Sequence, residues 1–134
     1  MGHQIRSGRF AAADEWYRWV VRSIDSYAVF SMDLENRIVT WDAGAERIFG
    51  YNRDDVVGEN ARFIFTLDDI SKQIPEAEVA DATAHNAALD ERWHVKKDGT
   101  VFWASGLLMR VFDDRKRHVG FVKLVRECPP DTKA

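Results

Sequence analysis

One stretch in the last third of the chain decides the fold: Trp93-His-Val-Lys-Lys-Asp-Gly-Thr-Val-Phe-Trp-Ala-Ser105. Its centre, Asp98-Gly99, is a strong short signal for a tight turn between two antiparallel strands. We therefore predict strands over residues 92–97 and 100–112. A polar turn follows, and the next apolar run predicts the last strand over 118–127.

The first part of the chain predicts a helix followed by another hairpin. Within 10–26, apolar side chains recur at helical spacing and form one stripe, made of Trp16, Trp19, Val20 and Ile24. The period then changes: 27–33 alternates as a strand does, and 37–41 has β-branched residues in its middle. Asn36, in the turn between them, tolerates a left-handed backbone.

Between the two hairpins the sequence predicts short helices. Asp42 caps a helix over 43–49 that Gly50 ends, and a single helical turn follows. Pro75 starts a longer helix over 76–89, which is rich in alanine and therefore forms easily but packs thinly. We predict an α+β fold with one five-stranded antiparallel sheet, a helical insert between strands 2 and 3, and an N-terminal amphipathic helix.

Composition sets the broad class of protein. The 134 residues are 46% hydrophobic and 31% charged, which is typical of one folded globular domain. A net charge of −3 argues against a nucleic-acid-binding protein, because such proteins concentrate basic residues. The single cysteine, Cys128, excludes a disulfide framework, and no apolar run has the ~18 residues of a membrane span. We expect a cytoplasmic domain without membrane contact.

The sequence contains no catalytic or metal-binding motif. It has no glycine-rich phosphate loop, no nucleophile elbow and no zinc-protease motif. Its four histidines are scattered, and its paired aspartates are typical of helix starts and turns. We therefore expect a binding or regulatory module that has no enzymatic activity and holds no metal.

Three stretches together resemble a bacterial PAS domain, and most of all the sensor modules of bacterial hybrid histidine kinases. They are the 93–105 hairpin, the segment Ile38-Val-Thr-Trp-Asp-Ala-Gly-Ala-Glu-Arg-Ile-Phe-Gly-Tyr51, and Gly120-Phe-Val-Lys-Leu-Val-Arg-Glu127. The resemblance covers about Ser23 to Glu127. With it, we assign 1–9 to a disordered end or an expression remnant, 10–26 to the N-terminal helix, 27–127 to the PAS domain, and 128–134 to the start of a C-terminal linker.

Within the PAS family, Gly58-Glu-Asn-Ala-Arg-Phe-Ile64 resembles a degenerate form of the flavin-photoreceptor (LOV) motif. Ala61 stands where LOV domains have the cysteine that forms the flavin adduct. Amides that bind the flavin ring are replaced by His94, Ala104 and Val125, whereas the phosphate-contacting arginine is retained as Arg62. His85 lies on the alanine-rich helix but away from the position of a haem ligand. We therefore expect neither flavin nor haem as a cofactor.

The same resemblance, with strand alternation, assigns a ligand pocket to the inner face of the sheet. Its expected residues are Phe30, Met32, Arg62, Phe63, His94, Ala104, Leu108, Phe121, Lys123 and Val125. Ala104 and Gly106 would leave room for a small anionic or polar metabolite, which would pair with Lys123, since a buried ammonium needs a partner.

An alternative places no ligand beside Lys123. Its ammonium would then reach solvent or pair with an acid of the helical insert, such as Asp68 or Asp69.

The outer face of the sheet is also apolar, which is unusual for an antiparallel sheet exposed to water. We expect a homodimer interface formed by this face and the N-terminal helix, with the residues Trp16, Trp19, Val20, Trp93, Trp103, Leu107 and Leu124. In the alternative interpretation, the helix covers the sheet of its own chain.

The main hypothesis is a sensory PAS module of a larger bacterial signalling protein, expected to be a histidine kinase. A small ligand or a partner would bias an output domain of the same chain through the dimer. One alternative is a ligand-free dimerisation module, and another is a flavin- or haem-binding sensor of light or redox state.

Overall fold

The structure is a computed structural model that describes residues 12–16, 18–20, 23–24 and 26–129. The expected disordered end over 1–9 and residues 130–134 of the expected linker lie outside the described residues. The main elements are, in chain order, β1 (Tyr27–Asp33), β2 (Ile38–Trp41), α2 (Ala43–Phe49), α3 (Arg53–Val56), η1 (Ala61–Ile64), α4 (Leu67–Ser71), α5 (Ile74–His85), β3 (Ala87–Leu89), β4 (Arg92–Val95), β5 (Val101–Phe112) and β6 (His118–Glu127).

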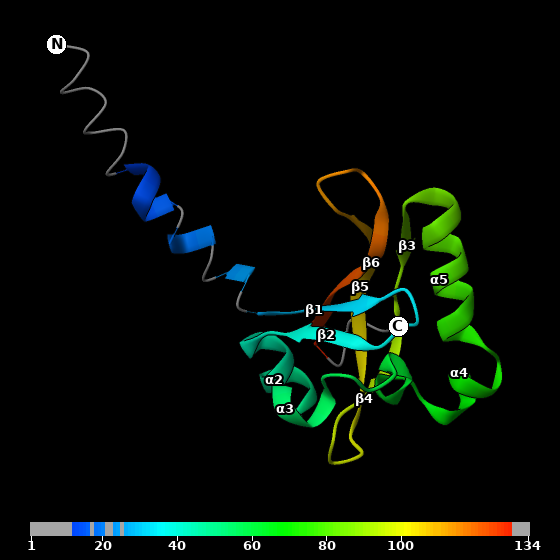
Figure 1. The fold of residues 1–134 in the computed structure, drawn as a ribbon. Coiled ribbons are helices and arrows are strands. Elements are labelled where there is room, and N and C mark those ends of the chain that lie inside the picture. Colours follow the sequence, from blue (N-terminus) through cyan, green and yellow to red (C-terminus); the bar gives the residue numbers. More distant parts are fainter. Residues whose placement is uncertain (1–11, 17, 21–22, 25, 130–134) are drawn as a thin grey trace, which may run out of the picture.

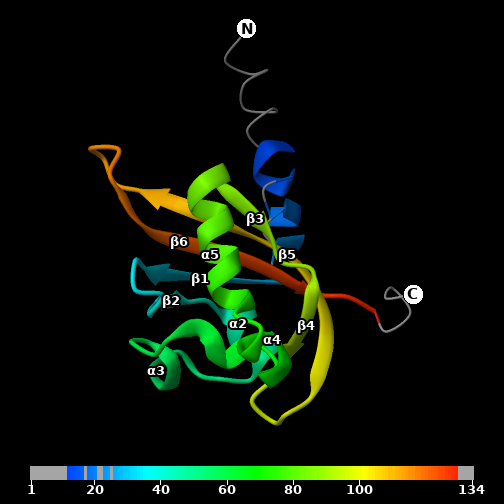
Figure 2. The ribbon, with the colours of Figure 1, turned by 90° about the vertical axis from the view of Figure 1, so that its right-hand side faces the viewer.

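The strands of the described residues form one antiparallel sheet of six strands with the order β2-β1-β6-β5-β3, in which β4 also pairs with β5. The insert from α2 to α5 lies on one face of this sheet (Figure 2). The core between the two layers contains the fully buried side chains of Phe30, Phe49, Phe121, Ile38, Ile64 and Val125. The predicted α+β class with a helical insert after the second strand is therefore confirmed.

Two hairpin turns have the same construction. Asp33 accepts hydrogen bonds from the backbone N–H of Glu35 and Arg37, and Asn36 has the expected left-handed backbone with φ of 65°. Asp113 likewise accepts from the N–H groups of Arg115 and Arg117 between β5 and β6. An aspartate before a turn thus replaces the backbone partners that the ladder no longer supplies.

The predicted first helix of the insert is confirmed over Ala43–Phe49. One oxygen of the Asp42 carboxylate accepts from the N–H of Ala45 at 2.7 Å and from the N–H of Val29 at 3.0 Å. This N-cap therefore also fastens α2 to β1. Gly50 ends the helix with φ of 85°, a left-handed conformation that suits glycine.

The alanine-rich helix ends earlier than the sequence predicts. Asn86 has φ of 71° and caps α5 directly after His85, and Ala87–Leu89 then forms β3 beside β5. The prediction of a helix to residue 89 is therefore wrong, and the short strand β3 is added to the antiparallel sheet that the sequence predicted. Residues with high helix propensity form a strand here because the edge of β5 is free to pair with them.

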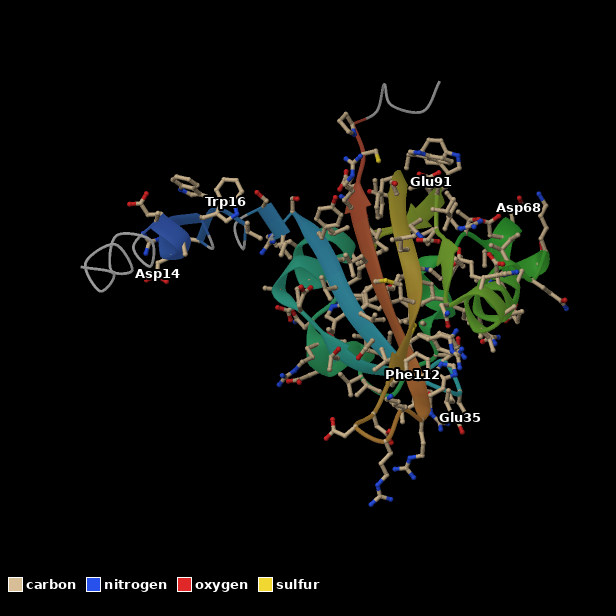
Figure 3. The ribbon with its side chains drawn as sticks, turned by 90° about the horizontal axis from the view of Figure 1, so that it is seen from above. Asp14, Trp16, Glu35, Asp68, Glu91 and Phe112 are labelled. Atoms are coloured by element: carbon tan, nitrogen blue, oxygen red, sulfur yellow. The ribbon has the colours of Figure 1, made fainter. Side chains whose placement is uncertain are left out.

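The described helical residues before the domain extend away from the sheet (Figure 1). Trp16 and Trp19 are 65% and 50% exposed, and their rings meet edge to face at 6.1 Å. Figure 3 shows Trp16 outside the body of the domain. The alternative in which this helix covers its own sheet is therefore not what the structure describes.

Candidate functional site

The candidate site lies between the inner face of the sheet and helix α5. Most side chains expected to face inward do so, and eight of them are buried: Phe30, Met32, His94, Ala104, Leu108, Phe121, Lys123 and Val125. Strand alternation therefore predicted correctly which side chains of these strands face inward. Their role in binding a ligand stays a prediction.

Two residues expected in the pocket lie outside it. The side chain of Arg62 is 55% exposed, donates its Nε–H to Asn60 Oδ1 at 3.2 Å and lies 3.9 Å from a carboxylate oxygen of Glu76. Phe63 is half-buried and packs against the rings of Trp41 and Tyr51. The expectation that Arg62 and Lys123 face the same space is wrong, because η1 presents Arg62 to solvent.

Lys123 is at the centre of a buried ionic cluster. Its side chain is 3% exposed, and Nζ donates to Glu78 Oε1 at 2.9 Å and lies 3.3 Å from Asp90 Oδ1. The ammonium also lies 4.4 Å from the centre of the Phe65 ring, in the range of a cation–π contact. Two carboxylates and one aromatic face thus surround this buried charge.

Lys123 pairs with an acid of the helical insert, as the alternative interpretation expected, but this acid is Glu78 and not Asp68 or Asp69. Asp68 is exposed and pairs with Lys72 at 3.0 Å, and Asp69 lies 3.9 Å from a guanidinium nitrogen of Arg92 at the rim of the cluster. The carboxylates that pair with Lys123 are instead those of Glu78 and Asp90.

Arg92 links the two carboxylates that surround Lys123. Its Nε donates to Asp90 Oδ1 at 2.9 Å and forms an ion pair with Glu78 Oε2 at 2.6 Å. Glu78 Oε2 nevertheless accepts no well-aligned hydrogen bond from the part of the chain that the structure describes. The cluster therefore pairs its charges while leaving one buried oxygen incompletely satisfied.

His94 completes the cluster from β4. Its Nδ1 lies 2.9 Å from the carbonyl oxygen of Ile64, and its Nε2 lies 2.7 Å from Asp90 Oδ2. A carbonyl and an ionised carboxylate can only accept hydrogen bonds, so both ring nitrogens donate and the ring is an imidazolium. This buried cation and Lys123 both face Asp90.

The two buried carboxyl groups differ in their affinity for a proton. Burial raises the pKa of Glu78 to about 8, and the charge of Lys123 opposes this effect. Burial alone would also raise the pKa of Asp90, but the charges of Lys123 and His94 hold it well below its usual range. Asp90 is therefore the permanent anion of the cluster, whereas Glu78 can exchange a proton near neutral pH.

Little space remains beside the cluster. A cavity of about 10 Å³ is lined by residues that include Ala61, Glu78, Leu108 and Lys123, and this volume is at the lower limit for one water molecule. The expectation that Gly106 leaves room for a ligand is wrong. A Cβ atom at this position would collide with the backbone carbonyl of Leu124, so glycine permits the close approach of β5 and β6.

Sequence reasoning missed Glu78 and Asp90, although each follows a regular pattern. Alternation along the edge of the sheet puts Asp90 on the inner face with Arg92 and His94. Glu78 lies three residues after Pro75 and four before Ala82 on α5, and these are the buried residues of that helix. Applying the two-residue spacing of strands and the three-to-four-residue spacing of helices to the charged residues would have placed Asp90 and Glu78 on the inner side.

The outer face of the sheet is incompletely covered in this structure. Trp93 and Leu107 are 42% and 37% exposed, while Trp103 and Leu124 are half-buried. Trp93 and Trp103 are directly paired across β4 and β5, and their rings meet edge to face at 5.3 Å. Their role in a dimer interface stays a prediction.

No group of three or more His, Cys, Asp or Glu side chains with a geometry suited to a metal ion occurs among the described residues. No helix in the described ranges is long and apolar enough to cross a membrane.

Comparisons with known proteins agree with this architecture. The sequence pattern of the PAS domain family matches residues 25–127, so the chain belongs to the PAS domain family. PAS domains are sensory modules.

A curated relative is "Two-component system protein A" of Emericella nidulans. It is 28% identical to this chain over 124 residues, which is 92% of this chain, and the chain spans 18% of that protein's length. The expected bacterial origin stays a prediction.

Two solved structures show the same fold. The PAS domain of a protein from Colwellia psychrerythraea is 18% identical with a TM-score of 0.71, and the match covers 84% of this chain and 96% of the other. The dark structure of the Aureochrome1 LOV photoreceptor is 20% identical with a TM-score of 0.62, and the match covers 78% of each chain. At these identities the likeness concerns the fold alone.

Proposed function

We infer that this PAS domain is the sensory module of a two-component signalling protein, with a histidine kinase as the parent chain. The relative from Emericella nidulans supports this role, because its name places it in a two-component system and it matches nearly the whole of this chain. The domain itself would carry out no chemistry. It would bias an output domain of the same chain.

The signal would pass through a homodimer. The observation that carries this part of the proposal is the apolar stripe of the N-terminal helix, where Trp16, Trp19, Val20 and Ile24 are all exposed. Large aromatic side chains are costly to expose and are enriched at the centres of protein interfaces. A second copy of the chain offers the same stripe and the same outer sheet face, as a two-fold interface requires.

Sedimentation velocity tests this proposal. We expect the wild type to be a dimer and the variant Trp16→Ala/Trp19→Ala to dissociate at concentrations where the wild type does not. Leu67→Ala is the matched control, because Leu67 is 84% exposed on α4 and lies outside the proposed interface. A wild type that remains a monomer at high protein concentration would contradict the dimer.

The ligand-free dimerisation module remains the second candidate function. The small size of the cavity beside Lys123 favours it. A flavin or haem sensor is the third candidate, and we propose that neither cofactor is bound. The absorbance spectrum of protein expressed with both cofactors available tests this directly, since a visible band in proportion to the protein would establish the cofactor sensor.

A further inference from the structure

The ionic cluster joins two different layers of the fold. Lys123 on β6 and Arg92 on β4 are cations of the sheet, and Asp90, between β3 and β4, comes from the edge of the same sheet. Glu78 is the carboxylate that helix α5 adds to them, at 2.9 Å from Lys123 Nζ and 2.6 Å from Arg92 Nε. Glu78 is therefore the side chain that links the helix to the ionic cluster of the sheet.

Glu78 fills this position imperfectly. It is 4% exposed, yet its Oε2 atom lacks a well-aligned hydrogen bond from the described residues. The other buried residues of α5, Pro75 and Ala82, are small, and its larger apolar residues, Ile74 and Val79, are only partly buried against the core. A carboxylate that is free to turn could satisfy both of its oxygens better than one held on a helix.

We propose that Lys123 and Arg92 form a binding site for one small carboxylate, and that Glu78 is the internal carboxylate that occupies this site in the structure. This inference rests on the proposed sensory function and names the class of ligand and its effect. A free carboxylate and Glu78 compete for the same two cations. Binding of the ligand therefore releases α5 from the inner face of the sheet, whose outer face belongs to the proposed dimer interface.

The charges of the cluster select a ligand with one negative charge. Without Glu78, the cations are Lys123, Arg92 and the His94 imidazolium, and the anions are Asp90 and, at the rim, Asp69. One positive charge is left over. A monocarboxylate neutralises it with charge-assisted hydrogen bonds, whereas a dianion would leave a buried negative charge.

Replacement of Glu78 by alanine provides the sharpest test, with acetate as the probe. This substitution removes one methylene and one carboxylate, and acetate carries one methyl and one carboxylate. We expect sodium acetate to raise the melting temperature of Glu78→Ala in a saturable way, beyond sodium chloride at equal ionic strength. Its affinity should be at least about tenfold higher than for the wild type, where Glu78 competes. Glu76→Ala, on the exposed side of α5, is the matched control and should respond as the wild type does.

The outcomes separate this site from the proposed dimer. The site is wrong if acetate stabilises Glu78→Ala no more than Glu76→Ala, or if Glu78→Ala/Lys123→Met keeps the acetate effect. If Glu78→Ala does not fold, Glu78→Gln takes its place at pH 9, where the wild-type side chain is a carboxylate and a neutral amide competes less strongly for the two cations. Sedimentation velocity of the same samples reports the oligomeric state. A protein that dimerises without an acetate effect contradicts only the carboxylate site, and a monomer that shows the acetate effect contradicts only the dimer.

Discussion

Replacement of Lys123 by methionine should destabilise the domain strongly. Methionine has a similar length, so it removes the ammonium without opening a large cavity. Glu78 and Asp90 then lose a cation that lies 2.9 and 3.3 Å from them, in a region shielded from water. Breaking a buried ion pair from one side costs about 3–5 kcal/mol, because the remaining charge stays buried without its partner.

The matched control is the same substitution at Lys96. Its ammonium lies 3.0 Å from a carboxylate oxygen of Glu127, but both side chains are partly exposed, at 26% and 44%. Surface ion pairs contribute about 0–1 kcal/mol. The N–O distances of the two ion pairs are therefore nearly equal, but their predicted contributions to the free energy of unfolding differ several-fold, because only the Lys123 pair is buried.

Urea unfolding followed by tryptophan fluorescence measures both variants. With a slope of about 1.5 kcal/mol per molar urea, a loss of 3 kcal/mol lowers the midpoint by about 2 M, and the control should move it by less than about 0.7 M. If Lys123→Met is no less stable than Lys96→Met, the buried cluster does not hold the fold together and the reasoning is refuted.

Three further predictions concern other parts of the molecule. Raising the pH from 5 to 9 should destabilise the wild type relative to Glu78→Gln in thermal melts. Burial raises the folded-state pKa of Glu78 to about 8 from an ordinary 4.5, so the stability that comes from protonated Glu78 is complete below pH 4.5 and is lost as the pH rises through 8. Equal pH profiles of the two proteins would contradict this prediction. Gly106→Ala should lower the melting temperature by several degrees, because its Cβ would collide with the β6 backbone, and an unchanged melting temperature would show that the strands can separate. Trp16→Ala/Trp19→Ala should raise the dimer dissociation constant at least about 30-fold in equilibrium ultracentrifugation, and a folded variant that dimerises normally would remove the helix from the interface.

Much of the fold could be predicted because its signals are local. Asp98-Gly99 marks the turn between β4 and β5, and the Asp42 cap and Gly50 mark the two ends of α2. The last strand begins and ends at the predicted residues, His118 and Glu127. Each of these signals acts through the backbone of a few adjacent residues, so it can be recognised without knowledge of distant contacts.

The third strand could not be predicted in the same way. Ala87–Leu89 has residues that favour a helix, and it becomes a strand because Asn86 ends α5 and β5 offers a free edge. That edge lies about 20 residues further along the chain, in β5. A local propensity argument gives no weight to such a partner.

The candidate site combines strand residues, of which every second side chain faces inward, with a helix residue, for which the spacing is three or four. These residues come together only in the folded chain. The alternation of strands correctly turned His94 and Lys123 inward, but their partners lie on another strand edge and on a helix. Lys123 is separated from Glu78 by 45 positions in the sequence. The need for a partner was predictable from burial, whereas the identity of that partner required the packing of α5 on the sheet.

The central claim is that Glu78 fastens α5 to the inner face of the sheet, and native-state hydrogen exchange tests it most directly. We predict that Glu78→Ala accelerates exchange of the amides of Ile74–His85 far more than that of the amides of β1 and β6, because the loss is local to the helix. Equal acceleration in the helix and in these strands, or unchanged protection of Ile74–His85, would contradict the claim.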